Sequence, residues 1–195
     1  EKIAAVQPSL PEGMKIVPFY DQTEVVNRAV STLTEALLEE FIVVFLVVLL
    51  FMGNFRSSIV VTSAIPIGIL IAFILMESID LSANLMSLGG IAIGIGVMTD
   101  ASIVMVENIY RHLAENQGRR NVIDVALEAS KEVAGPLFFS LSVVVVTFFP
   151  VFALTGTEGK LYNPMAWTKT FALAGSLILA VTLIPVLCTM LLKGK

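Results

Sequence analysis

The sequence predicts an all-α integral membrane protein with five membrane-spanning helices. Its 195 residues are 56% hydrophobic and 14% charged, with a mean hydropathy of +0.90. A soluble domain of this size cannot bury so much apolar surface. The formal net charge of −4 is spread over loops and helix ends, without a basic stripe and interleaved aromatic residues, so we expect no nucleic-acid partner.

Residues 1–22 have the composition of a water-exposed segment that is broken by several prolines. Within it, Lys15–Tyr20 is predicted to form a short strand. The opening lacks the basic-then-apolar pattern of a signal peptide, so we expect the chain to lie inside a longer natural sequence. The strand is then expected to pair within a soluble domain that the chain lacks.

Apolar runs define a transmembrane region over residues 23–195. The first helix is capped near Asp21 or Thr23, begins amphipathic and becomes wholly apolar from Phe41 to Met52. Residues 121–133 have apolar positions at helical spacing among charged ones, which predicts a helix along the cytoplasmic membrane surface. The predicted spans are about 36–52, 59–76, 85–107, 136–154 and 165–192.

Basic residues predict the orientation of these spans. Most basic residues collect on one side of the predicted membrane region, whereas the loops on the opposite side carry only Lys160, with Lys169 nearby. The positive-inside rule places the side that is richer in basic residues in the cytoplasm. The N-terminal segment is then periplasmic, and the C-terminus is cytoplasmic. The residues of the richer side are Arg56, Arg111, Arg119, Arg120, Lys131, Lys193 and Lys195.

The third span carries Asp100 inside the apolar stretch Leu88–Asn108. An acid near the centre of a membrane helix costs about 2.5 to 3.5 kcal/mol on insertion scales and usually faces a polar interior or an ion path. Glu107 lies two turns later on nearly the same face. Both carboxyl groups are candidates for a proton relay, with Asp100 the stronger one. The alternatives are a static hydrogen-bonded acid at Asp100 and a simple helix end at Glu107.

Glycines and methionines share this helix with Asp100. The small residues Gly90 and Gly94 are spaced for close helix approach, whereas the run does not have the spacing of a nucleotide-binding loop. Met98 and Met105 are two turns apart on a face roughly opposite Asp100. Thioether sulfur can bind soft ions such as Cu(I). Methionine also fills gaps in apolar packing, and the residue pattern alone favours this packing role over metal binding.

Several motifs together resemble the heavy-metal efflux branch of the resistance-nodulation-division (RND) exporters, and most closely its copper/silver pumps. The resemblance covers essentially the whole chain. It is carried by NLMSLGGIAI with GIGVMTDASIVMVEN, by the turn MGNFRSS, by EGKLYNPMAWTKTFALAG and by the ending IPVLCTMLLKGK.

The resemblance implies helices two to six of a twelve-helix, proton-driven inner-membrane transporter, which is not an enzyme. Residues 1–22 would end its periplasmic porter region. The implied pump is a homotrimer in the lipid bilayer that includes a second half beyond this chain and works with a periplasmic adaptor and an outer-membrane channel. It holds no permanent cofactor, and its cargo is Cu(I) or Ag(I).

The resemblance also assigns roles to individual residues. Asp100, followed by Ala101 rather than by a second aspartate, takes the proton-relay position of a metal pump. Met86, Met98 and Met105 fall on a metal route, where their partner positions are Leu173 and Cys188 instead of methionine. A valine is usual where Thr99 stands. The alternatives are an RND pump for divalent zinc, cobalt or nickel and a membrane scaffold that does not transport.

Overall fold

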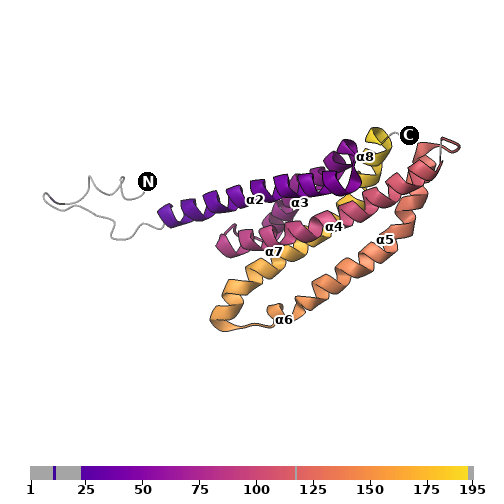
Figure 1. The fold of residues 1–195 in the computed structure, drawn as a ribbon. Helices are drawn as coiled ribbons and strands as arrows, with labels where there is room; N and C mark the ends of the chain where they lie inside the picture. The colour runs from indigo at the N-terminus through magenta and orange to yellow at the C-terminus, as the bar shows by residue number, and fades with distance from the viewer. Residues whose placement is uncertain (1–10, 12–22, 117, 193–195) are drawn as a thin grey trace.

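The computed structural model describes residue 11, residues 23–116 and residues 118–192. Every secondary-structure element in these ranges is helical, as the sequence predicts (Figure 1). The expected strand Lys15–Tyr20 lies outside the described residues. The helices are α2 (Thr23–Met52), α3 (Phe55–Ser78), α4 (Leu85–Asn116), α5 (Val122–Thr147), α6 (Phe149–Phe152), α7 (Gly156–Val181) and α8 (Leu183–Leu191).

Short polar turns separate the long helices. Only Gly53 and Asn54 connect α2 to α3, and Gly53 has a φ of +58°, a backbone conformation that glycine adopts without strain. The side chain of Asn54 then caps α3 by accepting a hydrogen bond of 3.0 Å from the backbone N–H of Arg56. Asn121 caps α5 in the same way. These caps fix where the helices begin.

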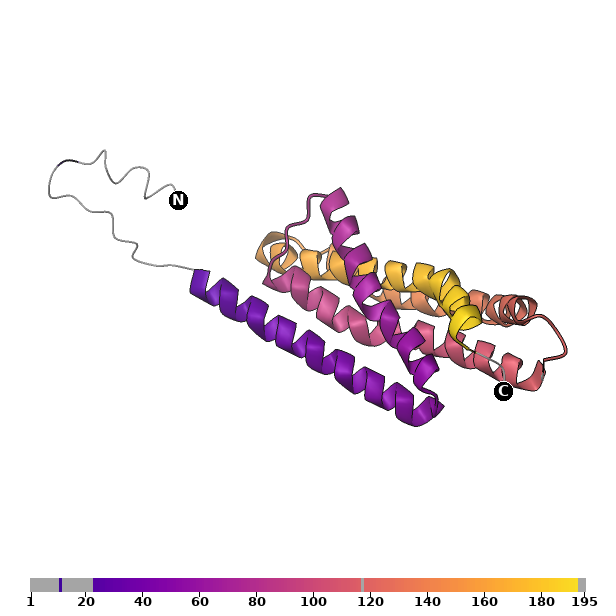
Figure 2. The same cartoon turned by 90° about the horizontal axis from the view of Figure 1, so that it is seen from above.

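The centre of the bundle is α4, which makes its most extensive contact with α7 (Figures 1 and 2). The two helices run in the same direction. A Cβ atom added to Gly90 would lie 2.5 Å from the Met165 carbonyl oxygen, and one added to Gly94 would lie 2.9 Å from Ala172 Cβ. The predicted close approach at these two glycines is therefore confirmed.

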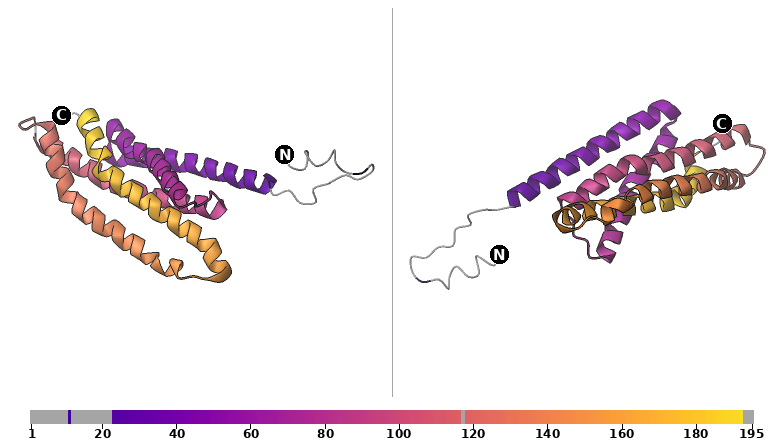
Figure 3. Two further views of the ribbon diagram at one scale, coloured as in Figure 1. Left: turned by 180° about the vertical axis from the view of Figure 1, so that it is seen from behind. Right: turned by 90° about the horizontal axis from the view of Figure 1, so that it is seen from below.

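Two helices flank α4 and a third stands apart from it. Helix α2 lies alongside α4, and α3 crosses both (Figure 2). Helix α5 contacts α4 near its own first turns and then diverges, so most of its apolar surface is exposed (Figure 3). The short helix α6 leads from α5 to α7. The described helices thus form an open bundle around α4.

Within the described ranges, four helical segments are long and apolar enough to cross a membrane: Phe55–Ser78, Leu85–Asn116, Val122–Phe152 and Gly156–Val181. The expected first span lies in α2, where Glu35, Glu39 and Glu40 restrict the wholly apolar part to residues 41–52. Four spans are therefore supported by length and composition.

Some helix boundaries differ from those expected. The predicted surface helix, 121–133, and most of the predicted span 136–154 form one continuous helix, α5, which contains Pro136. Proline removes a single backbone donor, and α5 tolerates that loss. Helix α7 begins at Gly156, within the stretch expected to be a loop, and the last predicted span is divided at Thr182 between α7 and α8.

Candidate functional site

The acidic residues of α4 lie on one exposed stripe of the helix. Asp100 is exposed within the described residues, and Glu107 follows it two turns later on the same side. Exposed positions recur every three or four residues, which is the spacing of one helix face. We call this face the acidic stripe. Its members are Ile93, Gly96, Asp100, Val104, Glu107 and Arg111.

The methionines of α4 lie on the opposite, buried face. Met98 is 1% exposed and Met105 is 0% exposed, whereas Met86 is half-buried near the start of the helix. The hydroxyl of Ser176 on α7 donates a hydrogen bond of 2.9 Å to the Met98 carbonyl oxygen. The structure therefore separates the acids and the two inner methionines onto different faces, as their spacing predicts.

The sulfur of Cys188 belongs to the same buried side of the bundle as Met105. Cys188 on α8 is fully buried, and so is Leu173 on α7 at 1% exposure. Both residues belong to the same hydrophobic cluster as Met105, whereas Met98 belongs to a second cluster with Met76. The candidate metal-route residues Met105 and Cys188 are thus in one cluster, and Met98 is in the other.

An acid from α2 adjoins the acidic stripe. The Oε1 atom of Glu40 lies 3.8 Å from the position that a Cβ on Gly96 would occupy. Glu40 was not among the candidate site residues predicted from the sequence. The missed signal was its spacing from Leu37 and Val44, which pack against the core and place Glu40 on the same face of α2.

A polar cluster joins the end of α4 to the start of α5. The side-chain amide of Asn108 donates to the Ala129 carbonyl at 2.9 Å and to Glu132 at 3.1 Å, while its oxygen accepts from Arg111 at 2.7 Å. His112 Nε2 is 2.9 Å from the same Glu132 oxygen. The partner of His112 therefore comes from α5, which is distant from His112 in the sequence.

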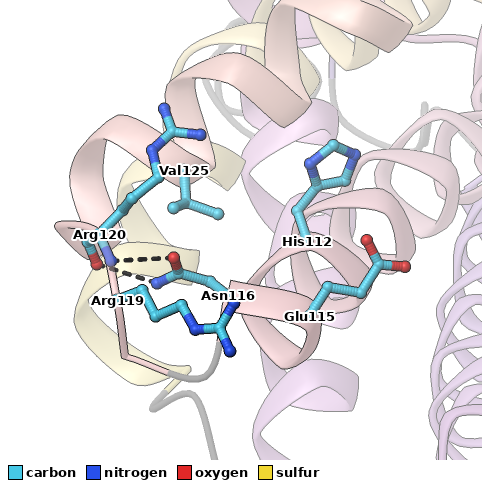
Figure 4. A pocket seen from close by; sticks show the side chains of 6 residues that line it. All are labelled: His112, Glu115, Asn116, Arg119, Arg120 and Val125. Carbon is cyan, nitrogen blue, oxygen red and sulfur yellow. Dashed lines mark hydrogen bonds between the residues drawn. The ribbon is translucent and has the colours of Figure 1, made fainter.

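A shallow pocket of about 250 Å³ lies beside this cluster, at the α4–α5 turn (Figure 4). The Asn116 side chain holds the turn by hydrogen bonds of 2.9 Å to the backbone N–H and carbonyl of Arg120. Arg120 also pairs with Glu128 at 2.7 Å, and both side chains are exposed. The polar side chains that line the pocket are therefore held mainly by contacts with one another and with the start of α5.

Lys169 is a buried cation that sequence reasoning counted only for orientation. It lies on α7, is 9% exposed, and its Nζ atom is 3.9 Å from the centre of the Phe148 ring. An ammonium group over an aromatic face is stabilised by the ring quadrupole. Among the described residues, no carboxylate forms an ion pair with Lys169.

The described side chains contain no group of three or more His, Cys, Asp and Glu that could hold a metal ion. What they do contain is an acid in the middle of an apolar helix and buried soft sulfur atoms on its other face. These features define a polytopic membrane segment with an intramembrane acid, a combination that marks proton and ion pathways.

Comparison with known proteins gives the family. Residues 1–195 match the AcrB/AcrD/AcrF family, and the chain belongs to it. It is 44% identical to the cation efflux system protein CusA of Escherichia coli K12 over 100% of the chain and 19% of that protein. It is 40% identical to the cobalt-zinc-cadmium resistance protein CzcA of Cupriavidus metallidurans, over 95% of the chain and 18% of that protein.

A solved structure agrees with the fold. The crystal structure of a heavy metal efflux pump matches 94% of the chain and 18% of its own chain, with a TM-score of 0.77 and 38% identity. The chain thus spans about a fifth of the length of its curated relatives.

Proposed function

We propose that the chain is a segment of a longer, proton-coupled metal-cation exporter in the bacterial inner membrane. In this proposal α2 is a fifth span, its N-terminal end faces the periplasm and the C-terminus faces the cytoplasm. The resemblance to RND pumps supports a homotrimer that includes a second half and works with a periplasmic adaptor and an outer-membrane channel. The segment by itself is not expected to transport.

The observation that carries the proposal is the position of Asp100 on the acidic stripe. An acid facing lipid at mid-helix is costly, so another part of the transporter is expected to cover the stripe and to supply a polar path. Loss or gain of a proton changes the charge on this face and therefore its packing against the covering part. Asp100 is the proposed proton-relay residue.

Glu107 is proposed as a second, weaker candidate nearer the cytoplasm. It lines a depression of about 140 Å³ with Asn108, Arg111 and Val133. Arg111 lies one turn later on the same stripe. A proton released from Asp100 would reach water through this region.

The proposed cargo is Cu(I) or Ag(I), which prefer thioether and thiolate ligands. Met98 and Met105 are buried inside the bundle, and Cys188 lies in the same cluster as Met105. Met86 is half-buried near the periplasmic end of α4 in the proposed orientation. These residues would form a route for the cargo, with no permanent cofactor.

A divalent cation such as zinc, cobalt or nickel is the second candidate cargo. The 40% identity to a cobalt-zinc-cadmium resistance protein supports it. Borderline divalent ions prefer imidazole and carboxylate ligands. A scaffold that does not transport is the remaining alternative, in which Asp100 has only a structural role.

The central experiment replaces Asp100 by Asn in the full-length transporter that contains this segment. Asn keeps the size and polarity of the side chain but cannot exchange a proton, so we expect transport of Cu(I) or Ag(I) out of cells to be lost. Expression and trimer assembly should stay unchanged. Wild-type metal resistance in Asp100→Asn cells would contradict the proton-relay role.

A second experiment tests the cargo route with Met98→Leu, Met105→Leu and Cys188→Ser. Leu matches methionine in size and lacks sulfur, so loss of Ag(I) resistance with normal expression supports the route. Zinc and cobalt resistance are measured in parallel and report the divalent alternative. Unchanged Ag(I) binding and tolerance in all three variants would return these residues to a packing role.

A further inference from the structure

Gly68 is the only glycine of α3, and it lies on the buried side of that helix. Glycine inside a helix is destabilising relative to alanine, so its presence there calls for a reason in the packing. A Cβ atom added to Gly68 would collide with the terminal methyl group of Met98 on α4. The end of the Met98 side chain therefore occupies the space that a side chain at position 68 would fill.

The sulfur atom of Met98 lies beside the same space. It is 3.7 Å from the position that a Cβ on Gly68 would occupy, and Leu179 Cδ1 on α7 is also 3.7 Å from that position. Ile65 and Ala72, which share a face of α3 with Gly68, belong to the same buried cluster as Met98. We call this space, which lies between Gly68 and Leu179 and holds the end of the Met98 side chain, the Gly68 notch.

Helix α7 fixes the other sides of the notch, where α3 crosses both α4 and α7 (Figure 2). The Ser176 hydroxyl holds the backbone of Met98 through its hydrogen bond to the carbonyl oxygen. A Cβ atom added to Gly175 would lie 3.0 Å from Ile71 Cγ2 and 3.6 Å from the Gly68 carbonyl oxygen, so α3 and α7 approach closely here. The Met98 thioether is therefore enclosed where three helices meet.

This enclosure decides where the sulfur atom lies. Methionine is long, unbranched and flexible, so its own chemistry leaves the position of its sulfur open, and the surrounding packing has to define it. Leu173, one of the two partner positions expected for the methionines, belongs to the other buried cluster, together with Met105. The packing that defines the position of the Met98 sulfur thus includes the α3 face around Gly68.

We infer that Gly68 is a positioning residue, which places the Met98 sulfur for the transported soft cation. A side chain at position 68 would displace the Met98 methyl group and the sulfur atom bonded to it. Metal sites lose affinity when a residue that orients a ligand is replaced, even though the ligand itself remains. This inference rests on the proposed cargo route and adds to it the residue that sets the position of one ligand.

The test follows the Met98 methyl group by NMR in the full-length transporter, isotopically labelled at its methionine methyl groups. The Met98 resonance is identified by its absence in Met98→Leu, and we expect it to shift as Ag(I) is added to the wild type. Gly68→Ala should move this resonance before any metal is added. It should also raise the Ag(I) concentration at half of the shift by about tenfold or more, the usual loss for a residue that orients a metal ligand.

Gly175→Ala is the matched control. It also adds a methyl group where α3 and α7 approach closely, but against Ile71 rather than against Met98. Overpacking should lower the melting temperature of both variants. In Gly175→Ala the Met98 resonance and its response to Ag(I) should stay those of the wild type. Equal losses of Ag(I) affinity in the two variants would show that overpacking alone is responsible and would overturn the inference.

The remaining outcomes also decide the matter. A wild-type Met98 resonance and titration in Gly68→Ala would overturn the inference. If Gly68→Ala does not assemble, Leu179→Ala takes its place, because it removes the opposite wall of the notch. Ag(I) must then bind Met98 more weakly in Leu179→Ala, and an unchanged titration would overturn the inference. A wild-type Met98 resonance that does not respond to Ag(I) would instead overturn the proposed cargo route itself, so the two failures are distinguishable.

Discussion

The Ser176 hydroxyl on α7 donates a hydrogen bond of 2.9 Å to the carbonyl oxygen of Met98 on α4. Both residues are buried, and the bond connects segments that are far apart in the chain. It fixes the register of two parallel helices at the level where Met98 faces the bundle interior. The position of a candidate metal ligand is therefore coupled to the rotation and height of α7.

Replacing Ser176 by Ala should remove this bond at little steric cost. Polar contacts between membrane helices contribute on average about 0.6 kcal/mol, so we expect a small drop in the melting temperature of the purified transporter. Ser142→Ala is the matched control, because that hydroxyl bonds only to Phe138 in its own helix. Equal effects of the two substitutions would show that the interhelical bond has no special contribution.

The contact of α4 with α7 predicts a strong difference between neighbouring glycines. Gly90→Ala forces a methyl group against the Met165 backbone and should cost about 1 to 3 kcal/mol of folding free energy, as overpacking usually does. Gly89→Ala meets no atom within 4 Å and should be neutral or slightly stabilising. Thermal unfolding of both variants measures the difference, and a destabilised Gly89→Ala would contradict the predicted packing.

The polar contacts at the junction of α4 and α5 should differ in strength. Asn108→Ala removes the hydrogen bonds to the Ala129 carbonyl, to Glu132 and from Arg111, and should cost about 1 to 3 kcal/mol. Glu128→Gln removes an exposed ion pair and should cost no more than about 1 kcal/mol. Denaturation in graded detergent mixtures compares the two. A larger effect of Glu128→Gln would reverse this ranking.

Burial of Cys188 predicts a protected thiol. The side chain is 0% exposed, and alkylating reagents need the accessible thiolate. We expect a water-soluble maleimide to label the folded transporter slowly at this position and the denatured transporter quickly. Replacing the other cysteines of the full-length protein ensures that the measured maleimide labelling comes from Cys188. Rapid labelling of the folded protein would show that the route around Met105 is open to water.

Helix identity was largely predictable from sequence, whereas helix boundaries were not. Long apolar runs and capping residues such as Thr23 predict helices because each feature acts locally. The joining of residues 121–133 to the next span was missed because Pro136 usually interrupts a helix, and its cost depends on tertiary contacts. The early start of α7 at Gly156 was missed for a different reason, because the polar residues there give no apolar signal.

The candidate site was predictable only within a single helix. Helical spacing correctly places Asp100 and Met98 on different faces of α4. The approach of Glu40 to Gly96 and of Lys169 to Phe148 depends on how separate helices cross, which no local pattern encodes. The roles of Asp100, Glu107 and the sulfur-containing residues remain predictions, tested by the transport experiments above.

The uninterrupted length of α2 has a mechanical consequence. The helix has 30 residues without glycine or proline, which is about 45 Å of stiff rod, and a link of only Gly53 and Asn54 ties its end to α3. A displacement of its first turns along the helix axis would therefore also displace Glu40. Sliding the helix by a single turn would carry the Glu40 carboxyl group about 5.4 Å past Gly96. A movement at the N-terminal end of α2 would then change the contact between α2 and α4 inside the bundle.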